Sequence, residues 1–218
     1  NIRTMINLEK PTFTATVPTL INDLLQADRS EPLDMGSFRV IVSGGSPVSP
    51  ALINAVRERW GVPVLQGWGM TETSPMCCLS IPPRDVHPPA DAQWRAKSGR
   101  PVPGMEVRIV GDAGIPLAHD GRTVGELQLH GPWVTGSYHQ HASIESFTAV
   151  GWLRTGDVGT IDPQGYVQIT DRTKDVIKAG GEWVSSVELE NASARHPSVY
   201  EVAVIGIPHD TWGEQVHA

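Results

Sequence analysis

Short apolar runs alternate with amphipathic segments along the first third of the chain. The runs FTATVP, FRVIVSGG and VPVLQGWG are typical of buried strands, and segments of helical periodicity lie between them at about residues 19–27 and 50–60. The second helix is well marked, because Ser49 can cap it and Pro50 suits its first turn. Its apolar face consists of Leu52, Ile53, Val56 and Trp60. This alternation predicts an α/β fold, with a parallel or mixed sheet covered by helices.

From about residue 98 to residue 170 the pattern changes to short strands separated by turns. The strands MEVRIV, GELQLHG, GWLRTGDVGTID and GYVQIT are joined by segments rich in Gly, Asp and Pro. This pattern of short strands and turns predicts a small antiparallel β-barrel or sandwich. The proline-rich segment PPRDVHPPADAQW precedes these strands and is the expected boundary between the two regions.

The last part of the chain is polar at first, helical near Ser186, and strand-like in VYEVAVIGIPHD. We therefore predict three parts: an α/β part at residues 1–97, a β-barrel-like part at residues 98–170, and a hinge with the start of a small α/β domain at residues 171–218. The chain stops within apparent β structure, so we expect this last domain to be truncated. The start, NIRTMINLEK, has neither an apolar signal core nor an initiator Met, as expected of a chain cut from a longer one.

Composition and charge narrow the classes of function. The 218 residues carry a formal net charge of -7, so no basic surface for nucleic acid or anionic lipid is expected. No apolar run reaches about 18 residues, and no transmembrane segment is expected. Cys77 and Cys78 are sequence neighbours, a spacing that rarely permits a disulfide and gives no metal-ligand pattern. These features favour a cytoplasmic protein.

Two loops that follow predicted strands carry candidate chemistry. In SGGSP, small residues let the backbone approach a ligand, although a strand-to-helix turn needs glycine in any case. In QGWGMTETSP, Glu72 offers a carboxylate for Mg²⁺, Thr71 a hydroxyl for phosphate and Trp68 a flat face for a base. The structural alternative is that Trp68 belongs to the core and that Thr71 and Glu72 merely begin a helix.

Later segments add charged candidates. TGDVG places Asp157 on a turn between two strands, where it would suit ribose hydroxyls, although an Asp before a turn is most often only a turn residue. DRTKDVIKAGG brings Arg172, Lys174 and Lys178 close to two glycines, either for phosphate or carboxylate charge or as a solvated face. No Ser-His-Asp order, metal-binding His pair or paired glycosidase carboxylates can be argued from the sequence.

Taken together and in order, these segments resemble the signatures of the adenylate-forming, or AMP-binding, superfamily. They are SGGSPVSP, LQGWGMTETSP, GELQLHGPWVTGSY, GWLRTGDVGTIDPQGYVQITDRTKDVIKAGGEWVSSVELE and AVIGIPHDTWGEQ, and they span about residues 40–215. The segment GGEWVSSVELEN is similar to the corresponding sequence of medium- and long-chain fatty acyl-CoA synthetases. The resemblance implies the C-terminal part of a large N-terminal domain, with sheet, helices and a small β-barrel, followed by the start of a small α/β C-terminal domain.

The activity implied by this resemblance is a two-step ligation. A fatty acid carboxylate attacks the α-phosphate of MgATP to give an acyl-adenylate and pyrophosphate, and the thiol of CoA then displaces AMP. The implied ligands are therefore ATP, Mg²⁺, CoA and a medium- or long-chain fatty acid, with no nucleic acid. A homodimer of the full-length protein stays open.

Residues of the first predicted part take nucleotide-binding roles by this resemblance. Gly45 and Ser46 would lie along the adenine pocket, and Gln66 and Gly67 would contact the nucleotide. Trp68, where the family more often has Tyr, would stack on the base.

The catalytic roles carried over by the resemblance fall on Thr71 and Glu72. Thr71 would hydrogen-bond the α-phosphate and Glu72 would hold Mg²⁺. Asp157 would take the ribose hydroxyls, and Arg172 would sit beside the ribose.

Residues near the end of the chain take the remaining implied roles. Lys174 falls at the family's hinge position and near the nucleotide. Lys178 and Trp183 match positions that approach the nucleotide, and Gly180 with Gly181 would border the CoA path.

Two departures from the family pattern bear on activity. The Ser/Thr/Gly-rich phosphate loop and the C-terminal lysine that contacts the acyl carboxylate are absent from these 218 residues. We therefore expect no turnover by this chain alone. The alternatives are a carrier-protein-loading or aryl-acid adenylating enzyme, a luciferase-like enzyme, and a non-catalytic nucleotide-binding remnant.

Overall fold

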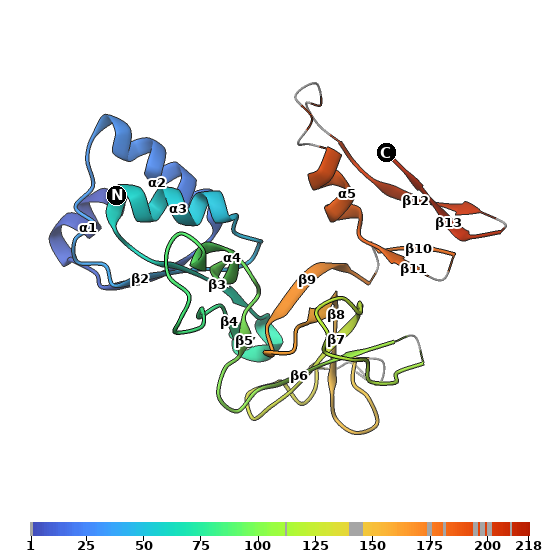
Figure 1. Cartoon of the computed structure of the whole chain (residues 1–218). Coiled ribbons are helices and arrows are strands. Elements are labelled where there is room, and N and C mark those ends of the chain that lie inside the picture. Colours follow the sequence, from blue (N-terminus) through green and yellow to red (C-terminus); the bar gives the residue numbers. More distant parts are fainter. Residues whose placement is uncertain are drawn as a thin grey trace. The chain divides into compact units, whose positions relative to one another are not determined.

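The chain divides into two units in its computed structural model (Figure 1). The structure describes residues 2–111, 113–139, 146–173, 176–180, 182–193, 196, 199, 202–209 and 211–218. The first unit comprises Asn1–Met105 and Pro132–Thr135, and the second comprises Glu106–Gly131 and Gly136–Ala218. The three-part division at residues 97/98 and 170/171 stays a prediction.

A five-stranded sheet forms the centre of the first unit, in the order β1-β2-β3-β4-β5. Its strands are β1 (Phe13–Thr16), β2 (Val40–Ser43), β3 (Val64–Trp68), β4 (Cys78–Leu79) and β5 (Arg100–Pro101). The first three are parallel, as expected from the alternating pattern, and β4 and β5 continue the sheet antiparallel. Ser43 lies opposite Gln66, so β2 and β3 end at the same edge of the sheet.

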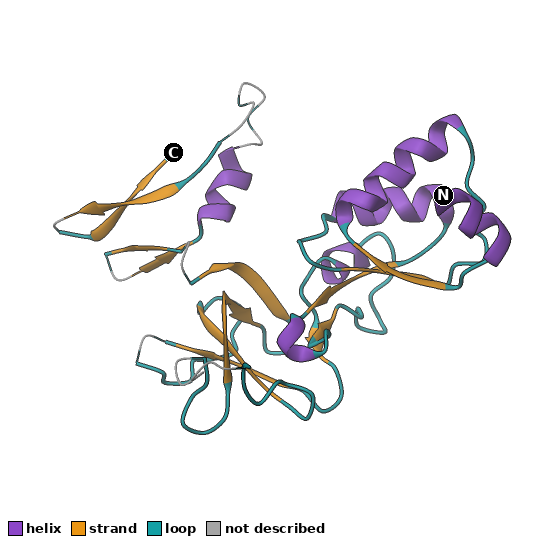
Figure 2. Cartoon of the chain, turned by 180° about the vertical axis from the view of Figure 1, so that it is seen from behind, coloured by secondary structure: helices purple, strands orange, loops and turns teal. Residues whose placement is uncertain are grey.

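Helices α2 and α3 lie along one face of this sheet (Figures 1 and 2). The unit contains α1 (Ile2–Glu9), α2 (Pro18–Ser30), α3 (Pro50–Trp60), the one-turn 3₁₀ helix η1 (Thr71–Thr73) and α4 (Asp91–Arg95). The helix expected at residues 50–60 is confirmed, and its cap is also as expected, since the Ser49 hydroxyl accepts a hydrogen bond from the Leu52 N–H at 3.1 Å. Helix α2 is longer at both ends than the expected residues 19–27.

The core of the first unit is built from apolar side chains of these helices and strands. Fully buried members include Ile21, Ile41, Ile53, Val56 and Val64. Each such side chain contributes about 1.5–3 kcal/mol relative to an exposed position. The apolar face predicted for α3 is confirmed at Leu52, Ile53 and Val56, while Trp60 is only partly buried against the cluster.

Buried carboxylates join the helices to one another. Asp28, at the end of α2, is 1% exposed, forms an ion pair with Arg59 of α3 and accepts a hydrogen bond from the Leu33 N–H at 2.6 Å. Burial alone would raise the pKa of Asp28, but the hydrogen bonds from Leu33 and Arg59 outweigh burial and hold it below its ordinary value. Asp91 of α4 likewise pairs with Arg57 at 2.8 Å and with Arg95 at 2.6 Å.

The second unit begins with an antiparallel sheet in the order β6-β7-β8-β9. The strands are β6 (Glu106–Val110), β7 (Gly125–His130), β8 (Leu153–Ile161) and β9 (Val167–Arg172). The strands match those predicted, but among the described residues no pairing between β6 and β9 closes them into the expected barrel. Each strand pairs with its neighbour in sequence, which gives an open meander.

The remainder of the second unit carries a four-stranded sheet and one helix. The elements are β10 (Ile177–Ala179), β11 (Glu182–Val184), α5 (Ser186–Ser193), β12 (Ile205–His209) and β13 (Gly213–His217), with the strand order β11-β10-β13-β12. The helix expected near Ser186 is confirmed. Its first turn is held by buried Asp171, whose Oδ2 accepts hydrogen bonds from both the N–H and the hydroxyl of Ser186 at 2.9 Å.

Candidate active site

The two loops that the sequence singled out in the first unit lie side by side at one edge of its sheet. They follow β2 and β3, which are adjacent and parallel. A Cβ atom on Gly44 would lie 3.3 Å from the carbonyl oxygen of Gly67, so the glycine allows a close approach of the two backbones. Gly45 has φ of +79°, a conformation that favours glycine. Ligands of parallel α/β sheets bind at this carboxyl edge.

Gln66 connects the two loops through its side chain. It is 6% exposed, and its Oε1 accepts a hydrogen bond from the Val48 N–H at 2.8 Å. The amide oxygen is therefore engaged with the residue that directly follows the SGGSP loop, while Ser46 in that loop is exposed. A direct contact between Gln66 and a nucleotide stays a prediction, and the structure adds a role in positioning the loop.

The loop after β3, residues 69–77, is named here the TET loop. Thr73 is fully buried, and its Oγ1 accepts a hydrogen bond from the Met70 N–H at 2.9 Å. The same hydroxyl lies 2.9 Å from the carbonyl oxygen of Met70 and 3.0 Å from that of Pro75, the two acceptors for its hydrogen. A Cβ on Gly69 would lie 1.9 Å from the Pro75 oxygen, so only glycine fits there. The loop is thus tightly closed on itself.

The side chains of the TET loop differ in exposure. Thr71 is exposed and Glu72 is partly exposed, whereas Thr73 is buried. A carboxylate and a hydroxyl next to each other in sequence are oxygen donors of the kind that Mg²⁺ and phosphate groups take. One carboxylate suffices where phosphate oxygens and water complete the coordination of Mg²⁺, so Glu72 fits this metal. Among the described residues no larger cluster of His, Cys, Asp or Glu offers a metal site.

Trp68 lies in β3 and is 7% exposed. It pairs with Cys78 of β4, and its carbonyl oxygen accepts a hydrogen bond from the Cys77 N–H at 2.9 Å. Both cysteines are fully buried. This burial agrees with the alternative that Trp68 is a core residue, and stacking on a base stays a prediction.

Asp157, in the second unit, lies within strand β8 and not on a turn between two strands as the sequence suggested. The register between β7 and β8 shifts here, with Glu126 opposite Val158 and Gln128 opposite Arg154. Two extra residues of β8 therefore form a bulge, and Gly156 adopts φ of +72° within it. Glycine and aspartate mark bulges as well as turns, which explains the error.

Asp157 and Arg172 face each other across β8 and β9. They are paired in register, and Nε of Arg172 lies 3.5 Å from Oδ1 of Asp157. Asp157 is 7% exposed, while the Arg172 side chain is largely exposed. The structure thus brings together two residues that the sequence assigned to ribose binding.

Lys178 and Trp183 also come together, on the hairpin of β10 and β11. Nζ of Lys178 lies 4.6 Å from the centre of the Trp183 ring, a cation–π arrangement. Gly180 has φ of +62° and donates its N–H to the carbonyl oxygen of Trp212 at 2.8 Å. Two of the predicted site residues, Lys174 and Gly181, lie outside the residues that the structure describes.

Three residues that form hydrogen bonds important for these loops and for α5 were not predicted from the sequence. Thr73 stands inside the recognised motif and could have been found there. Asp171 and Trp133 act on residues 15 and 57 positions away, through hydrogen bonds that no local pattern indicates.

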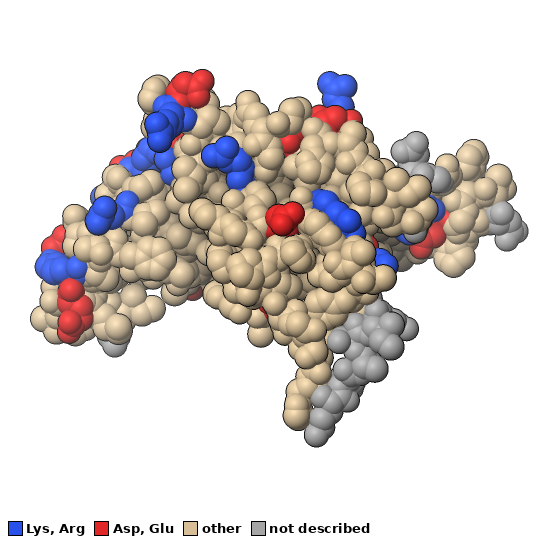
Figure 3. Space-filling view, turned by 90° about the horizontal axis from the view of Figure 1, so that it is seen from below, with Lys and Arg blue, Asp and Glu red and all other residues tan. Residues whose placement is uncertain are grey.

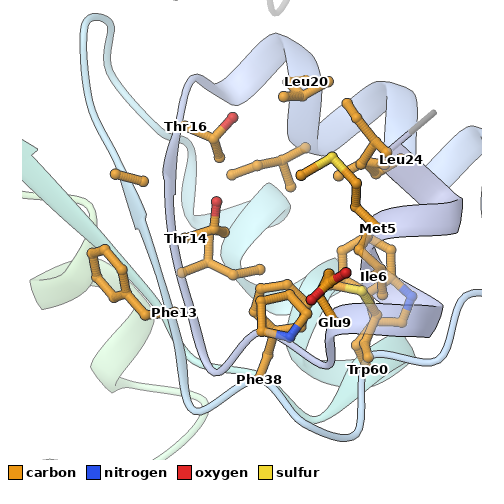
Figure 4. Close-up of a pocket in the computed structure, with 16 residues that line it drawn as sticks. Met5, Ile6, Glu9, Phe13, Thr14, Thr16, Leu20, Leu24, Phe38 and Trp60 are labelled. Atoms are coloured by element: carbon orange, nitrogen blue, oxygen red, sulfur yellow. The ribbon is translucent and has the colours of Figure 1, made fainter.

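An apolar pocket of about 350 Å³ occupies another part of the first unit, lined by α1, β1 and α2 (Figure 4). Met5, Ile6, Phe38 and Trp60 belong to its wall, and Glu9 is the one charged residue among the described residues that line it. None of the residues predicted to bind nucleotide lines it. The pocket is therefore no part of the predicted nucleotide site.

Surface charge gives no single patch on the face seen in Figure 3, where Lys and Arg side chains are interspersed with Asp and Glu. Among the described helices, none has the length and apolar character that a membrane span requires.

Comparison with known proteins identifies the family. The AMP-binding enzyme family matches residues 2–139, and the AMP-binding enzyme C-terminal domain matches residues 188–218. The chain is 43% identical over 212 residues to a long-chain-fatty-acid–CoA ligase of Thermus thermophilus, covering 95% of this chain and 39% of that protein. It is 42% identical over 207 residues to a 3-methylmercaptopropionyl-CoA ligase of Ruegeria lacuscaerulensis, covering 94% and 38%.

A solved structure shows the same fold. The o-succinylbenzoate CoA synthetase of Bacillus subtilis, in complex with its acyl-adenylate intermediate, matches with a TM-score of 0.79 and 32% identity, over 99% of this chain and 42% of that one. The chain spans about two fifths of the length of these relatives. It belongs to the AMP-binding enzyme family and has the mixed α/β fold of adenylate-forming enzymes.

Proposed function

We propose that this chain supplies the nucleotide-binding part of an AMP-forming CoA ligase that activates a medium- or long-chain fatty acid. The observation that carries the proposal is the TET loop, which presents Thr71 and Glu72 at the carboxyl edge of parallel strands, beside the SGGSP loop. A carboxylate and a hydroxyl suit Mg²⁺ and phosphate, and ligands of α/β sheets bind at this edge.

The proposed reaction has two steps that balance without a redox partner. A carboxylate oxygen of the acid attacks the α-phosphorus of ATP, and the bond to pyrophosphate breaks. The sulfur of CoA then attacks the acyl carbon, the bond to AMP breaks, and the thiol proton is released. Both steps depend mainly on holding the reactants together and on neutralising phosphate charge.

Residues of the TET loop serve the first step in this proposal. The Thr71 hydroxyl donates to an α-phosphate oxygen, and Glu72 holds Mg²⁺, which when bound neutralises phosphate charge. The neighbouring Gly45, Ser46, Gln66, Gly67 and Trp68 form the adenine side of the site. The fixed loop keeps these donors in place before the nucleotide arrives.

Residues of the second unit serve the ribose and the second step. Asp157 accepts hydrogen bonds from the ribose hydroxyls, with Arg172 beside it. Lys174 acts as hinge, and Lys178 and Trp183 approach the nucleotide. Gly180 and Gly181 border the path of CoA.

The acid is the part of the proposal that the relatives constrain least. One relative is named for long-chain fatty acids, another for 3-methylmercaptopropionate and the solved structure for o-succinylbenzoate. The segment GGEWVSSVELEN favours a fatty acid as the substrate. Aryl-acid activation, carrier-protein loading and a non-catalytic remnant are the competing functions, and a cytoplasmic homodimer belongs to the same proposal.

The test is thioester formation by the full-length protein that contains this sequence. AMP and acyl-CoA are measured with acids from acetate to palmitate and with benzoate. Thioester formation that peaks at medium or long chains supports the proposal. A peak at benzoate assigns an aryl-CoA ligase, AMP formation without thioester assigns a carrier-loading enzyme, and no ATP turnover contradicts an enzymatic function.

We also predict that the 218-residue chain does not turn over by itself, because its residues lack the phosphate loop and the C-terminal lysine of the family pattern. The measurement is acid-dependent pyrophosphate release by the isolated chain, with the full-length protein as the positive control. Acid-dependent release above the no-acid background would contradict this prediction.

A further inference from the structure

A short segment from a distant part of the sequence holds the TET loop from outside. Pro132–Thr135 belongs to the first unit, although the residues on both sides of it belong to the second. The N–H of Thr135 donates to the carbonyl oxygen of Glu72 at 2.8 Å, and the Ser74 hydroxyl donates to the carbonyl oxygen of Trp133 at 3.2 Å. The indole Nε1–H of Trp133 donates to the carbonyl oxygen of Met76 at 3.1 Å.

These three hydrogen bonds bracket the turn that carries the candidate catalytic residues. One reaches Glu72 within η1, one reaches Ser74 directly after it, and one reaches Met76 farther along. They engage the backbone carbonyls of Glu72 and Met76 and the hydroxyl of Ser74. The segment therefore holds the loop by its backbone on both sides of Thr73.

Trp133 is 38% exposed, and the buried side of its ring packs against another turn of the first unit. A Cβ on Gly104 would lie 3.5 Å from Cζ3 of the ring, so the indole packs directly over this glycine, whose φ is +94°. The next residue, Met105, is buried, and Val102 donates its N–H to the carbonyl oxygen of Cys77 at 2.9 Å. The indole thus bridges the segment around Gly104 and the end of the TET loop.

We propose that Trp133 is a positioning residue, which through its indole N–H and its backbone holds the TET loop in the conformation that receives magnesium–nucleotide. This inference rests on the proposed function. The loop is ordered by the protein before binding, so binding energy is not spent on ordering it. Without the indole donor, the loop becomes ordered only when MgATP binds, and part of the binding free energy is then spent on ordering it.

The test is Trp133→Phe in the full-length protein, since phenylalanine keeps an aromatic ring over Gly104 and removes the N–H. We expect the KM for MgATP to rise by about threefold to tenfold, the effect of losing one hydrogen bond. The kcat per active site should stay within about twofold, because the loop is ordered once the nucleotide is bound. A merely structural role would lower the active fraction and leave this KM unchanged.

A matched control is Trp152→Phe, the same change on the second unit, where the ring lies 4.3 Å from the Arg108 guanidinium. It should leave the KM for MgATP within about twofold of the wild type. An equal rise in both variants, or no rise in Trp133→Phe, overturns the proposal.

Hydrogen exchange of the ligand-free protein separates this proposal from the proposed function. In Trp133→Phe, amides of residues 70–77 should exchange about threefold to tenfold faster than in the wild type, while those of β7 do not change. Unchanged exchange in the loop overturns the positioning role. Faster exchange in a protein that shows no ATP turnover would confirm the hold on the loop and reject the proposed function alone.

Discussion

At the residue scale, three consecutive side chains of the TET loop have different tasks. Thr73 is buried, and its hydroxyl closes the loop by hydrogen bonds with the backbone of Met70 and Pro75. Thr71 is exposed and Glu72 is partly exposed. Their exposure leaves the side chains of Thr71 and Glu72 accessible to a ligand under the proposed function. A change at Glu72 should therefore affect activity much more than stability.

We predict that Glu72→Gln in the full-length protein lowers kcat for acyl-adenylate formation by about hundredfold, because the neutral amide binds Mg²⁺ poorly and stabilises the developing phosphate charge less well. Pyrophosphate exchange over a range of Mg²⁺ concentrations measures this effect. The control Glu58→Gln removes the same charge from an exposed position on α3 and should change kcat by less than about twofold. Wild-type activity in Glu72→Gln would exclude Glu72 as the metal ligand.

At the element scale, tight backbone approaches hold the loops at the sheet edge. Gly44 passes close to Gly67, and Gly69 passes so close to Pro75 that no side chain fits. The loop conformation therefore depends on the absence of a Cβ atom as much as on its hydrogen bonds. Substitutions at these glycines act on the whole loop.

For Gly69→Ala we predict a loss of about 1–3 kcal/mol in the free energy of unfolding, because the new Cβ would lie 1.9 Å from the Pro75 oxygen and the loop has to shift. Gly136→Ala is the matched control, since a Cβ there meets nothing within 4 Å, and we expect a change within about 0.5 kcal/mol. Urea denaturation followed by tryptophan fluorescence measures both. Equal stabilities of the two variants would show that the loop accommodates the methyl group.

At the scale of the whole molecule, the buried carboxylate of Asp28 makes stability depend on pH. Asp28 joins α2 to α3 and to the segment that follows α2. Since its pKa in the folded chain is below the ordinary value, its ionised form contributes stability that is fully present above the unfolded pKa, about 3.9. That contribution is lost as the pH falls through the folded pKa.

Asp28→Asn should accordingly lower the melting temperature near neutral pH and flatten its decrease as the pH falls below the unfolded pKa of about 3.9. Thermal unfolding followed by circular dichroism at a series of pH values measures both effects. Asp23→Asn, an exposed change on the same helix, serves as control and should follow the wild-type curve. Parallel curves for Asp28→Asn and the wild type would mean that Asp28 has no part in acid unfolding.

The same scales describe what the sequence could predict. The helix at residues 50–60 was found because its cap at Ser49 and its apolar face are local features. Asp157 was placed on a turn because glycine and aspartate signal a bulge and a turn alike. Trp133 and Asp171 could not be found, since their partners are distant in sequence and come close only through the fold.

The fully buried neighbours Cys77 and Cys78 have a practical consequence. Burial raises the pKa of Cys78 well above its usual range, and the contact with Cys77 adds to this, so the thiol is neutral and shielded from alkylating reagents. Iodoacetamide can reach these thiols when the end of the TET loop, which contains Cys77, or strand β4, which begins at Cys78, moves away from β3. The rate of labelling therefore measures the opening of this edge of the sheet, and a bound nucleotide that stabilises the edge should slow it.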